Sequence, residues 1–222
     1  MLRNFTKNAD GSVLISFGDT RVLCTATVEE RVPPWLKGQN RGWVTAEYAM
    51  LPGSASEGRI SRDATRRGRA MEISRLIGRS LRSVIDLGRL GERQITIDCD
   101  VLQADGGTRT AAITGGYVAL HDAISGLVER ESIGESPMIG ECAAISIGLL
   151  KGEAYLDLCY TEDAAADVDL NLVMKGDESI IEVQATAEGQ AFDRAQLDDM
   201  LDLGRKGIFE LLDFQREALR DG

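Results

Sequence analysis

The sequence predicts a mixed α+β fold in which helices pack on β-sheets, and three features of its patterning carry this prediction. Short segments alternate apolar and polar residues, as half-buried strands do, and several of them are joined by tight-turn sequences. Three longer segments instead carry apolar residues at helical spacing. The length of 222 residues, with 43% hydrophobic and 27% charged residues, fits one globular domain over residues 1–222.

In the N-terminal half, Gly18-Asp19-Thr20 separates the first two strands and favours a tight hairpin. A loop rich in Gly and Ser at 52–58 precedes the first long helix, and the paired glycines Gly106-Gly107 precede the second. The predicted apolar face of the first helix consists of Met71, Ile73, Leu76, Ile77, Leu81, Val84 and Ile85. The predicted elements are strands at 11–17, 21–28 and 43–48, a helix at 63–86, a strand at 95–101 and a helix at 108–129.

In the C-terminal half, two further hairpins are predicted, because Lys151-Gly152-Glu153 and the segment 175–178 are turn sequences between apolar runs. Asp193 is a good helix N-cap, and Gln196 three residues later completes a capping box at the start of the last helix. The predicted elements are strands at 143–150, 154–159, 168–174 and 179–186 and a helix from 193 onward.

The overall composition excludes several classes of function. With 25 Lys and Arg against 36 Asp and Glu, the net charge of −11 argues against a general nucleic-acid coat or a binder of anionic membranes, unless the basic residues are segregated. No stretch approaches the roughly 20 apolar residues of a membrane span, and the start lacks the apolar core of a secretory signal. We therefore expect a cytoplasmic protein.

Cysteine and histidine usage narrows the chemistry. Without a CxxC pair, the scattered cysteines are expected to be buried reduced thiols rather than disulfides or zinc ligands. They are Cys24, Cys99, Cys142 and Cys159. The single histidine, His121, lies on an apolar helical pattern and is expected to be a partly buried helix residue. Catalysis is therefore not expected to use an imidazole.

The basic residues are indeed segregated. Between positions 59 and 82 only Asp63 and Glu72 oppose eight arginines, so this stretch has a net charge of +6. Arginine binds phosphate groups bidentately through its planar guanidinium, and the absence of lysine here favours repeated phosphate recognition. A solvated helix face with intramolecular salt bridges is the alternative. The eight are Arg59, Arg62, Arg66, Arg67, Arg69, Arg75, Arg79 and Arg82.

Two more segments carry candidate chemistry. Gly106-Gly107-Thr108-Arg109 stands at a strand-to-helix junction, where unpaired N–H groups, a hydroxyl and a guanidinium would bind an anion; Thr108 as an ordinary N-cap is the alternative. The second segment is a carboxylate cluster without His or Cys, which favours Mg²⁺ or Mn²⁺ over zinc, or is simply a solvated acidic turn. Asp167 and Asp169 are expected on the same face of a strand. The cluster consists of Glu162, Asp163, Asp167 and Asp169.

Taken together, these segments resemble a known family. Residues 91–115, including Asp105-Gly106-Gly107-Thr108-Arg109, closely resemble the signature of bacterial ribonuclease PH. The likeness extends to residues 11–29, 31–34, 42–52, 69–82 and 168–188 and to the final helix. The resemblance implies the fold of ribosomal protein S5 domain 2 and a phosphorolytic 3′→5′ exoribonuclease. Such an enzyme trims the 3′ ends of tRNA precursors, and by extension of rRNA, as a hexameric ring of three dimers.

The resemblance also implies roles for individual residues. Inorganic phosphate, the co-substrate, attacks the last internucleotide phosphorus in a reversible reaction that releases a nucleoside diphosphate. The family's phosphate site corresponds to Arg69, Gly107, Thr108 and Arg109. Its catalytic aspartates, which hold Mg²⁺ or Mn²⁺, correspond to Asp163 and Asp169. We assign RNA binding to Arg59, Arg62, Arg66 and Arg67.

The chain departs from the family pattern at several positions. The family usually has an N-terminal arm before the segment that corresponds to Asn4 onward, whereas this sequence begins close to Asn4. The loop before Arg69 is also shorter than is usual in the family. Gly53, Ala70 and Ser74 stand where the family usually has Arg, Thr and Gln. These differences affect the expected RNA contacts and ring assembly more than the phosphate site. The alternative function is a non-catalytic, RNA-binding ring subunit.

Overall fold

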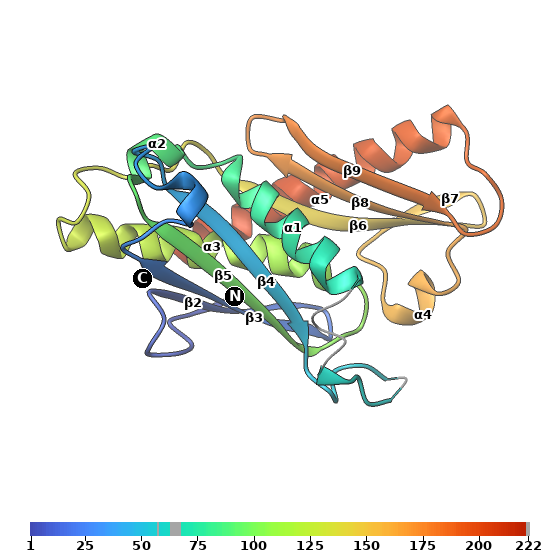
Figure 1. The fold of residues 1–222 in the computed structure, drawn as a ribbon. Coiled ribbons are helices and arrows are strands. Elements are labelled where there is room, and N and C mark those ends of the chain that lie inside the picture. Colours follow the sequence, from blue (N-terminus) through green and yellow to red (C-terminus); the bar gives the residue numbers. More distant parts are fainter. Residues whose placement is uncertain (57, 63–67, 221–222) are drawn as a thin grey trace.

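A computed structural model describes residues 1–56, 58–62 and 68–220 and has the predicted α+β fold, with two β-sheets and helices packed on them (Figure 1). The strands of the first sheet follow the order β1-β2-β3-β5-β4, and those of the second the order β7-β6-β8-β9. Neighbouring strands are antiparallel, except that β4 and β5 are parallel. The first sheet comprises β1 (Leu2–Arg3), β2 (Gly11–Phe17), β3 (Thr20–Glu29), β4 (Trp43–Met50) and β5 (Gln94–Gln103). The second comprises β6 (Cys142–Leu150), β7 (Glu153–Leu156), β8 (Val168–Lys175) and β9 (Ile180–Ala187).

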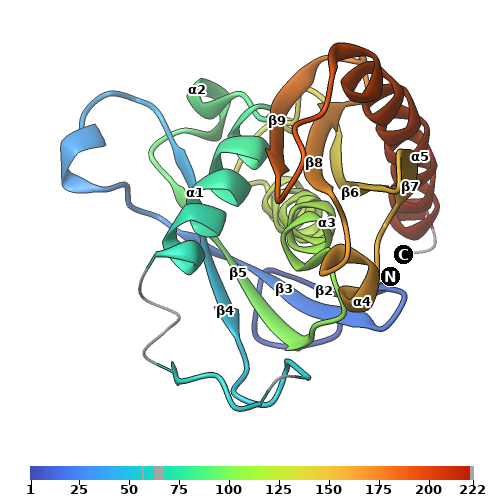
Figure 2. The same ribbon diagram turned by 90° about the vertical axis from the view of Figure 1, so that its right-hand side faces the viewer.

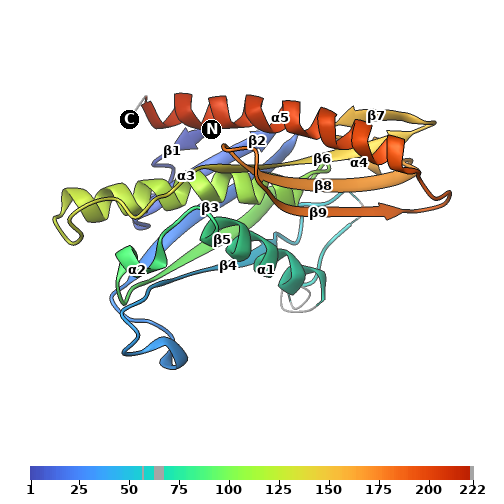
Figure 3. The same ribbon diagram turned by 90° about the horizontal axis from the view of Figure 1, so that it is seen from above.

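Helix α3 forms the centre of the molecule, between the two sheets (Figure 2). It is buried nearly all round, as expected for a helix covered on opposite sides. Helix α5 covers the other face of the second sheet and forms a second apolar core with it (Figure 3). No helix of the described chain is long and apolar enough to cross a membrane. The helices are η1 (Pro34–Leu36), α1 (Arg69–Arg82), α2 (Leu87–Leu90), α3 (Thr108–Glu129), α4 (Tyr160–Asp163) and α5 (Arg194–Arg220).

Strand β1 lies beside the last turns of α5, and Arg3 ties the two together. Its guanidinium forms a salt bridge with Asp122 of α3, with 2.8 Å between Nη2 and Oδ1, and donates a hydrogen bond to the carbonyl oxygen of Ala218 in α5. The Asp122 side chain is only 7% exposed. The short β1 strand is therefore anchored to both long helices.

Most predicted elements are confirmed, and the differences have local causes. The first helix was expected over 63–86 but begins at Arg69 and ends at Arg82; residues 63–67 lie outside the described residues. Met71 is 44% exposed because it lies about 200° round the helix from the buried Ile73. Strand β7 stops at Leu156 rather than residue 159, since Asp157 has a positive φ of 53° and α4 follows. The capping box is confirmed, with hydrogen bonds of 2.9 Å in both directions between Asp193 and Gln196.

Helix α1 covers the free edge of β4 and thereby fixes where Arg69 lies. The Ser74 hydroxyl accepts a hydrogen bond from the Tyr48 N–H at 3.0 Å, and Arg82 donates one to the Val44 carbonyl oxygen at 2.7 Å. Edge strands that leave such groups unpaired recruit other chains, so these side chains protect the sheet. They also hold α1 with its first residue beside the start of α3.

Cys24 of β3 lies opposite Cys99 of β5 in the register of the two strands, and both are free thiols. Both are buried, as is Cys142. Burial raises the pKa of the Cys142 thiol to about 12. Cys159, expected to be buried, is partly exposed because it precedes α4 at the surface. His121 is partly buried in α3, as predicted, and burial lowers its pKa.

Candidate active site

One cavity of about 230 Å³ is lined by all the residues to which the family resemblance assigns phosphate or metal binding. Its walls come from separate parts of the chain: the first residue of α1, the start of α3, helix α4, strands β6 and β8, and the end of β4 with the loop after it. His121 lies 13 residues into α3, about 20 Å along the axis from its start, so imidazole takes no part in this site. The predicted residues that line the cavity are Arg69, Gly107, Thr108, Arg109, Asp163 and Asp169.

The start of α3 is shaped by its two glycines. Gly106 and Gly107 have φ angles of 82° and 58°, and Gly107 is the N-cap without any side-chain cap. The first intrahelical bond at this end joins the Ala111 N–H to the Gly107 carbonyl, so the preceding amides have no acceptor within the helix. The Thr20 hydroxyl fixes the loop by donating to the Gly106 carbonyl at 2.6 Å. The junction therefore presents a rigid set of N–H donors to the cavity.

Thr108 is not the N-cap, which removes the alternative role considered for it. It is the first residue of α3, and its hydroxyl lies 2.8 Å from the Tyr48 hydroxyl. Burial raises the pKa of Tyr48, so its phenol stays protonated near neutral pH. With Tyr48 donating, the Thr108 hydroxyl hydrogen is left for an anion in the cavity.

The two arginines are held differently. Arg69 is exposed and interacts electrostatically with both Tyr48 and Asp169. Arg109 is largely buried, with a side chain 13% exposed, and its Nη1 donates to Gln184 Oε1 at 2.8 Å. The same Nη1 lies 3.7 Å from Glu72 Oε1.

Only two of the four clustered carboxylates reach the cavity. Asp169 is half-buried on β8, and burial, followed by repulsion from Asp163, raises its pKa. Asn171 donates to both Asp169 oxygens at 3.3 Å. Glu162 instead turns back to accept from the Cys159 N–H at 3.0 Å. The expectation that Asp167 and Asp169 share a face of one strand is wrong for this protein.

Asp167 precedes β8 rather than lying on it, and its carboxylate accepts from the Lys151 N–H at 3.0 Å. It therefore serves the hairpin between β6 and β7. The pairing of Asp163 with Asp169 depends on α4, a single turn that no periodicity in the sequence indicates.

Ser146 is a cavity residue that sequence reasoning missed. It lies on β6 opposite Asn171 of β8, inside a continuous apolar run that marks it only as a buried strand residue. It is 6% exposed, and its Oγ has no hydrogen-bond partner among the described residues. A Cβ placed on Gly107 would lie 3.6 Å from that Oγ, so the hydroxyl faces the start of α3.

The arginine-rich segment divides into two parts. Arg79 forms a salt bridge with Glu182 at 2.6 Å, and Arg82 lies 4.3 Å from the centre of the Trp43 ring, so these two hold α1 in place. The salt-bridge alternative is confirmed for Arg79, whereas Arg82 is held by the Trp43 ring and the Val44 carbonyl oxygen rather than by a carboxylate. Arg59 and Arg62 are exposed before α1, whereas the predicted RNA contacts Arg66 and Arg67 lie outside the described residues.

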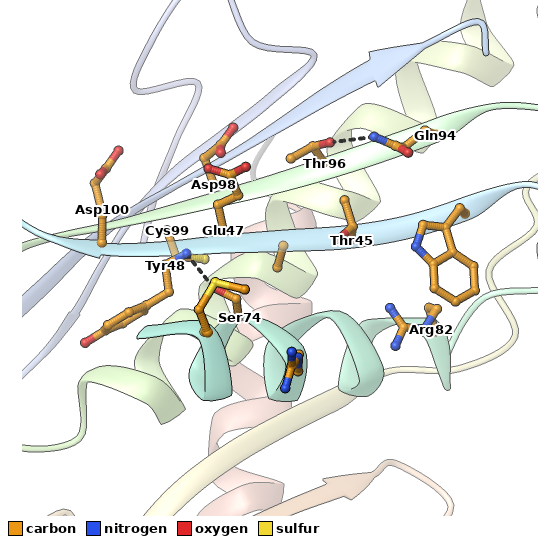
Figure 4. Close-up of a pocket in the computed structure, with 15 residues that line it drawn as sticks. Thr45, Glu47, Tyr48, Ser74, Arg82, Gln94, Thr96, Asp98, Cys99 and Asp100 are labelled. Carbon is orange, nitrogen blue, oxygen red and sulfur yellow. Dashed lines mark hydrogen bonds between the residues drawn. The ribbon is translucent and has the colours of Figure 1, made fainter. Parts of the chain in front are cut away.

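A larger groove of about 830 Å³ lies along β4, β5 and α1 (Figure 4). Its lining includes Glu47, Asp98 and Asp100 from the strands. Burial raises the pKa of Asp98 and Asp100, and Glu47 raises that of Asp98 further. Because a row of carboxylates repels phosphate, the smaller cavity at the start of α3 is the candidate active site.

Comparison with known proteins agrees with this fold. Rrp46 of rice (Oryza sativa) has a TM-score of 0.77 at 20% identity over 98% of this chain and 92% of that one. The Archaeoglobus fulgidus exosome with RNA bound to the active site has a TM-score of 0.79 at 20% identity over 96% and 85%. An archaeal exosome core has a TM-score of 0.74 at 19% identity over 97% and 85%. These likenesses support the fold shared by ribonuclease PH and ribosomal protein S5 domain 2.

Two family matches cover most of the chain. Residues 2–125 match domain 1 of the 3′ exoribonuclease family, and residues 140–207 match its domain 2. The first match contains α1 and the start of α3, and the second contains α4 and β8, so both halves of the cavity lie within matched segments. The chain therefore belongs to the 3′ exoribonuclease family.

Proposed function

We propose that this protein is a phosphate-dependent 3′→5′ exoribonuclease of the ribonuclease PH type, which shortens RNA and releases nucleoside diphosphates. The observation that carries the proposal is the single cavity in which a helix start, two arginines and two carboxylates converge. A generic RNA-binding surface needs basic residues but neither a fixed anion cradle nor paired carboxylates. Arg59 and Arg62, which are exposed, precede α1 in the chain, and the first residue of α1 lines the cavity.

The attacking phosphate would be held by groups of complementary charge and shape. Arg69 and Arg109 supply the charge, while Thr108, the amides at the start of α3 and the Ser146 hydroxyl supply directed donors. Holding phosphate in line with the last phosphodiester lowers the entropic part of the barrier. The role of these residues is thus binding and orientation, which needs no nucleophile from the protein.

The reaction balances without a proton from the chain. An oxygen of hydrogen phosphate bonds to the terminal phosphorus, and the bond from that phosphorus to the preceding 3′ oxygen breaks. The proton of hydrogen phosphate ends on the released 3′ oxygen. Because one phosphate ester is exchanged for a phosphoanhydride, the reaction is expected to run in both directions.

The carboxylates fit a hard divalent cation. Among the described residues no cluster of three or more His, Cys, Asp or Glu ligands occurs, so a self-contained metal cage is absent. Mg²⁺ usually takes one or two carboxylates and completes its shell with water and substrate phosphate oxygens. Asp163 and Asp169 are suited to that role, and Mn²⁺ is the alternative ion. When bound, such a cation would offset the negative charge that gathers on the reacting phosphoryl group.

The proposal is tested by product analysis. RNA with a 3′ extension, incubated with Mg²⁺, should release nucleoside diphosphates only when phosphate is present; nucleoside monophosphates would contradict the proposal. Arg109→Ala should lower turnover about 100-fold or more while the protein remains folded, because a charged donor to the reacting groups is lost. Arg79→Ala is the matched control, since Arg79 comes from the same arginine segment but pairs with Glu182.

Trimming of tRNA 3′ ends and assembly into a hexameric ring of three dimers are further parts of the proposal. The basic segment before α1, with Arg59 and Arg62 exposed, would gather around the ring opening and grip the RNA. Light scattering should show a hexamer, and a monomer would contradict the ring. A preference for tRNA precursors should appear as faster trimming of a 3′-extended tRNA than of an unstructured RNA.

A non-catalytic RNA-binding ring subunit is the second candidate, and one observation favours it. Gly53, where the family usually has an arginine, is exposed with no atom near the position of a Cβ. An RNA contact is therefore missing from the loop beside the cavity. RNA binding without nucleotide release would support this candidate, while phosphate-dependent release would exclude it.

A further inference from the structure

Arg109 is held by a neutral side chain rather than by a carboxylate. Its Nη1 donates to Gln184 Oε1 at 2.8 Å, and Gln184 Nε2 donates to Glu72 Oε1 at 3.3 Å. The three residues come from α3, β9 and α1 and form a chain of contacts beside the cavity. Glu72 itself remains 3.7 Å from Arg109, with a side chain 52% exposed.

Glu72 decides which way the Gln184 amide points. A carboxylate only accepts hydrogen bonds, so it selects the NH₂ end of the amide and directs the carbonyl oxygen toward Arg109. The guanidinium thereby gains a fixed neutral partner, while the Glu72 carboxylate stays at 3.7 Å, beyond hydrogen-bond distance.

A second arginine that contacts β9 is held by a carboxylate instead of an amide. Two residues earlier on β9, Glu182 pairs with Arg79 at 2.6 Å. Residues two apart on a strand share a face, so both arginines meet β9 from the same side. Arg79 therefore meets a carboxylate on β9, whereas Arg109, which lines the cavity, meets a neutral amide there and has its carboxylate partner Glu72 farther away, at 3.7 Å.

We propose that Gln184 is a positioning residue, which orients Arg109 while leaving its positive charge available to a phosphate anion. This inference rests on the proposed function, because it takes the cavity to bind phosphate. In the part of the chain that the structure describes, the other charged or titratable groups around Arg109 are Glu72 of α1, Asp169 of β8 and Tyr48 of β4, together with Arg69 and Asp163, which line the same cavity. Gln184 is the only close partner on β9 among the described residues.

The test is the isosteric variant Gln184→Glu, with binding of inorganic phosphate measured by titration calorimetry. Near pH 8 the new carboxylate should weaken phosphate binding about tenfold or more, because it neutralises Arg109. A glutamate titrates at about pH 4.3 and the adjacent Arg109 lowers the pKa of the new carboxyl further, so the titration is extended below about pH 4, where this carboxyl takes up a proton and again offers a neutral acceptor. The ratio of variant to wild-type affinity should therefore recover toward one, which loss of packing alone would not produce.

Val183→Glu is the matched control. Val183 is 39% exposed on the opposite face of β9, so this change adds the same charge to the same strand away from Arg109. It should change phosphate affinity less than about twofold, since a solvent-exposed charge is screened.

The outcomes separate the two proposals. If the wild-type protein does not bind phosphate, the proposed function fails. If the wild type binds but Gln184→Glu binds equally well, or if Val183→Glu weakens binding as much, the role of Gln184 is overturned. A steady-state check accompanies the titration: Gln184→Glu should raise the KM for phosphate while leaving the KM for RNA unchanged.

Discussion

Gly106 is where the loop before α3 crosses closest to the rest of the chain, and replacing it tests how the anion cradle is built. A Cβ at this position would lie 2.1 Å from the carbonyl oxygen of Leu158. The residue also has a φ of +82°, which side chains other than glycine rarely adopt. Gly106→Ala therefore introduces backbone strain and a clash with another backbone segment at once.

Gly18 separates these two effects. It has a similar positive φ of 52° in the hairpin between β2 and β3, and a Cβ there would meet nothing within 4 Å. Gly18→Ala should cost only the left-handed strain, about 1–2 kcal/mol. At Gly106 the contact is roughly 1 Å too short, so relieving it adds about 1–3 kcal/mol for displaced structure.

The assay compares thermal unfolding and phosphate binding of both variants. For a chain of this size, about 1 kcal/mol corresponds to roughly 2–4 °C in Tm, so Gly106→Ala should lose roughly 5–15 °C and Gly18→Ala clearly less. Gly106→Ala should also weaken phosphate binding about tenfold or more, since the helix start moves. Equal losses of Tm in the two variants would refute the close approach at Gly106.

Four further outcomes are expected. Ser146→Ala should weaken phosphate binding about threefold to tenfold, the value of one hydrogen bond, without lowering Tm, because the hydroxyl has no partner among the described residues. Asp163→Asn should lower the pKa of Asp169 measured by NMR titration without metal, since repulsion from Asp163 helps to raise it. Because the pKa of Asp169 is raised in the folded protein, the protein loses stability as the pH rises and this carboxyl ionises. Asp169→Asn should therefore raise Tm at neutral pH. It should not raise Tm below pH 3.8, the ordinary pKa, where the carboxyl is protonated. Asp122→Ala should cost about 3 kcal/mol in urea unfolding, because it strands Arg3 beside buried surface.

Each of these predictions has its own control or its own contradicting result. For the salt bridge, Asp198→Ala removes an exposed partner of Arg194 and should cost less than about 1 kcal/mol; a similar cost for both would contradict the importance of burial. An unchanged phosphate affinity in Ser146→Ala would place that hydroxyl outside the anion site. An unchanged pKa of Asp169 in Asp163→Asn would show that the two carboxylates do not interact.

Elements that depend on neighbours in the chain could be predicted from the sequence. Helix α3 has the predicted bounds, because paired glycines precede Thr108 and the apolar run that follows is continuous. The Asp193 cap was predictable for the same reason, since its partner Gln196 is one turn away. The first helix was predicted too long because the apolar pattern continues through Val84 and Ile85, which are buried after the helix has ended.

Pairings between distant segments could not be predicted in the same way. Whether Asp163 or Asp167 joins Asp169 depends on the single turn α4, whose residues show no periodic pattern. Ser146 has the same sequence context as any polar residue in a buried strand, and only the register of β6 against β8 brings it to the cavity.

The sequence by itself determined the strands, the long helices, the segregation of arginine from the acidic remainder and the likeness to a phosphorolytic family. These properties follow from local spacing and from motifs that are contiguous in the chain. The tertiary structure decided which arginine meets a carboxylate on β9 and which meets a neutral amide. Arg79 meets Glu182 and Arg109 meets Gln184 only because α1 and the start of α3 lie along the same face of β9. These two contacts depend on strand register and helix packing, which bring together residues far apart in the sequence.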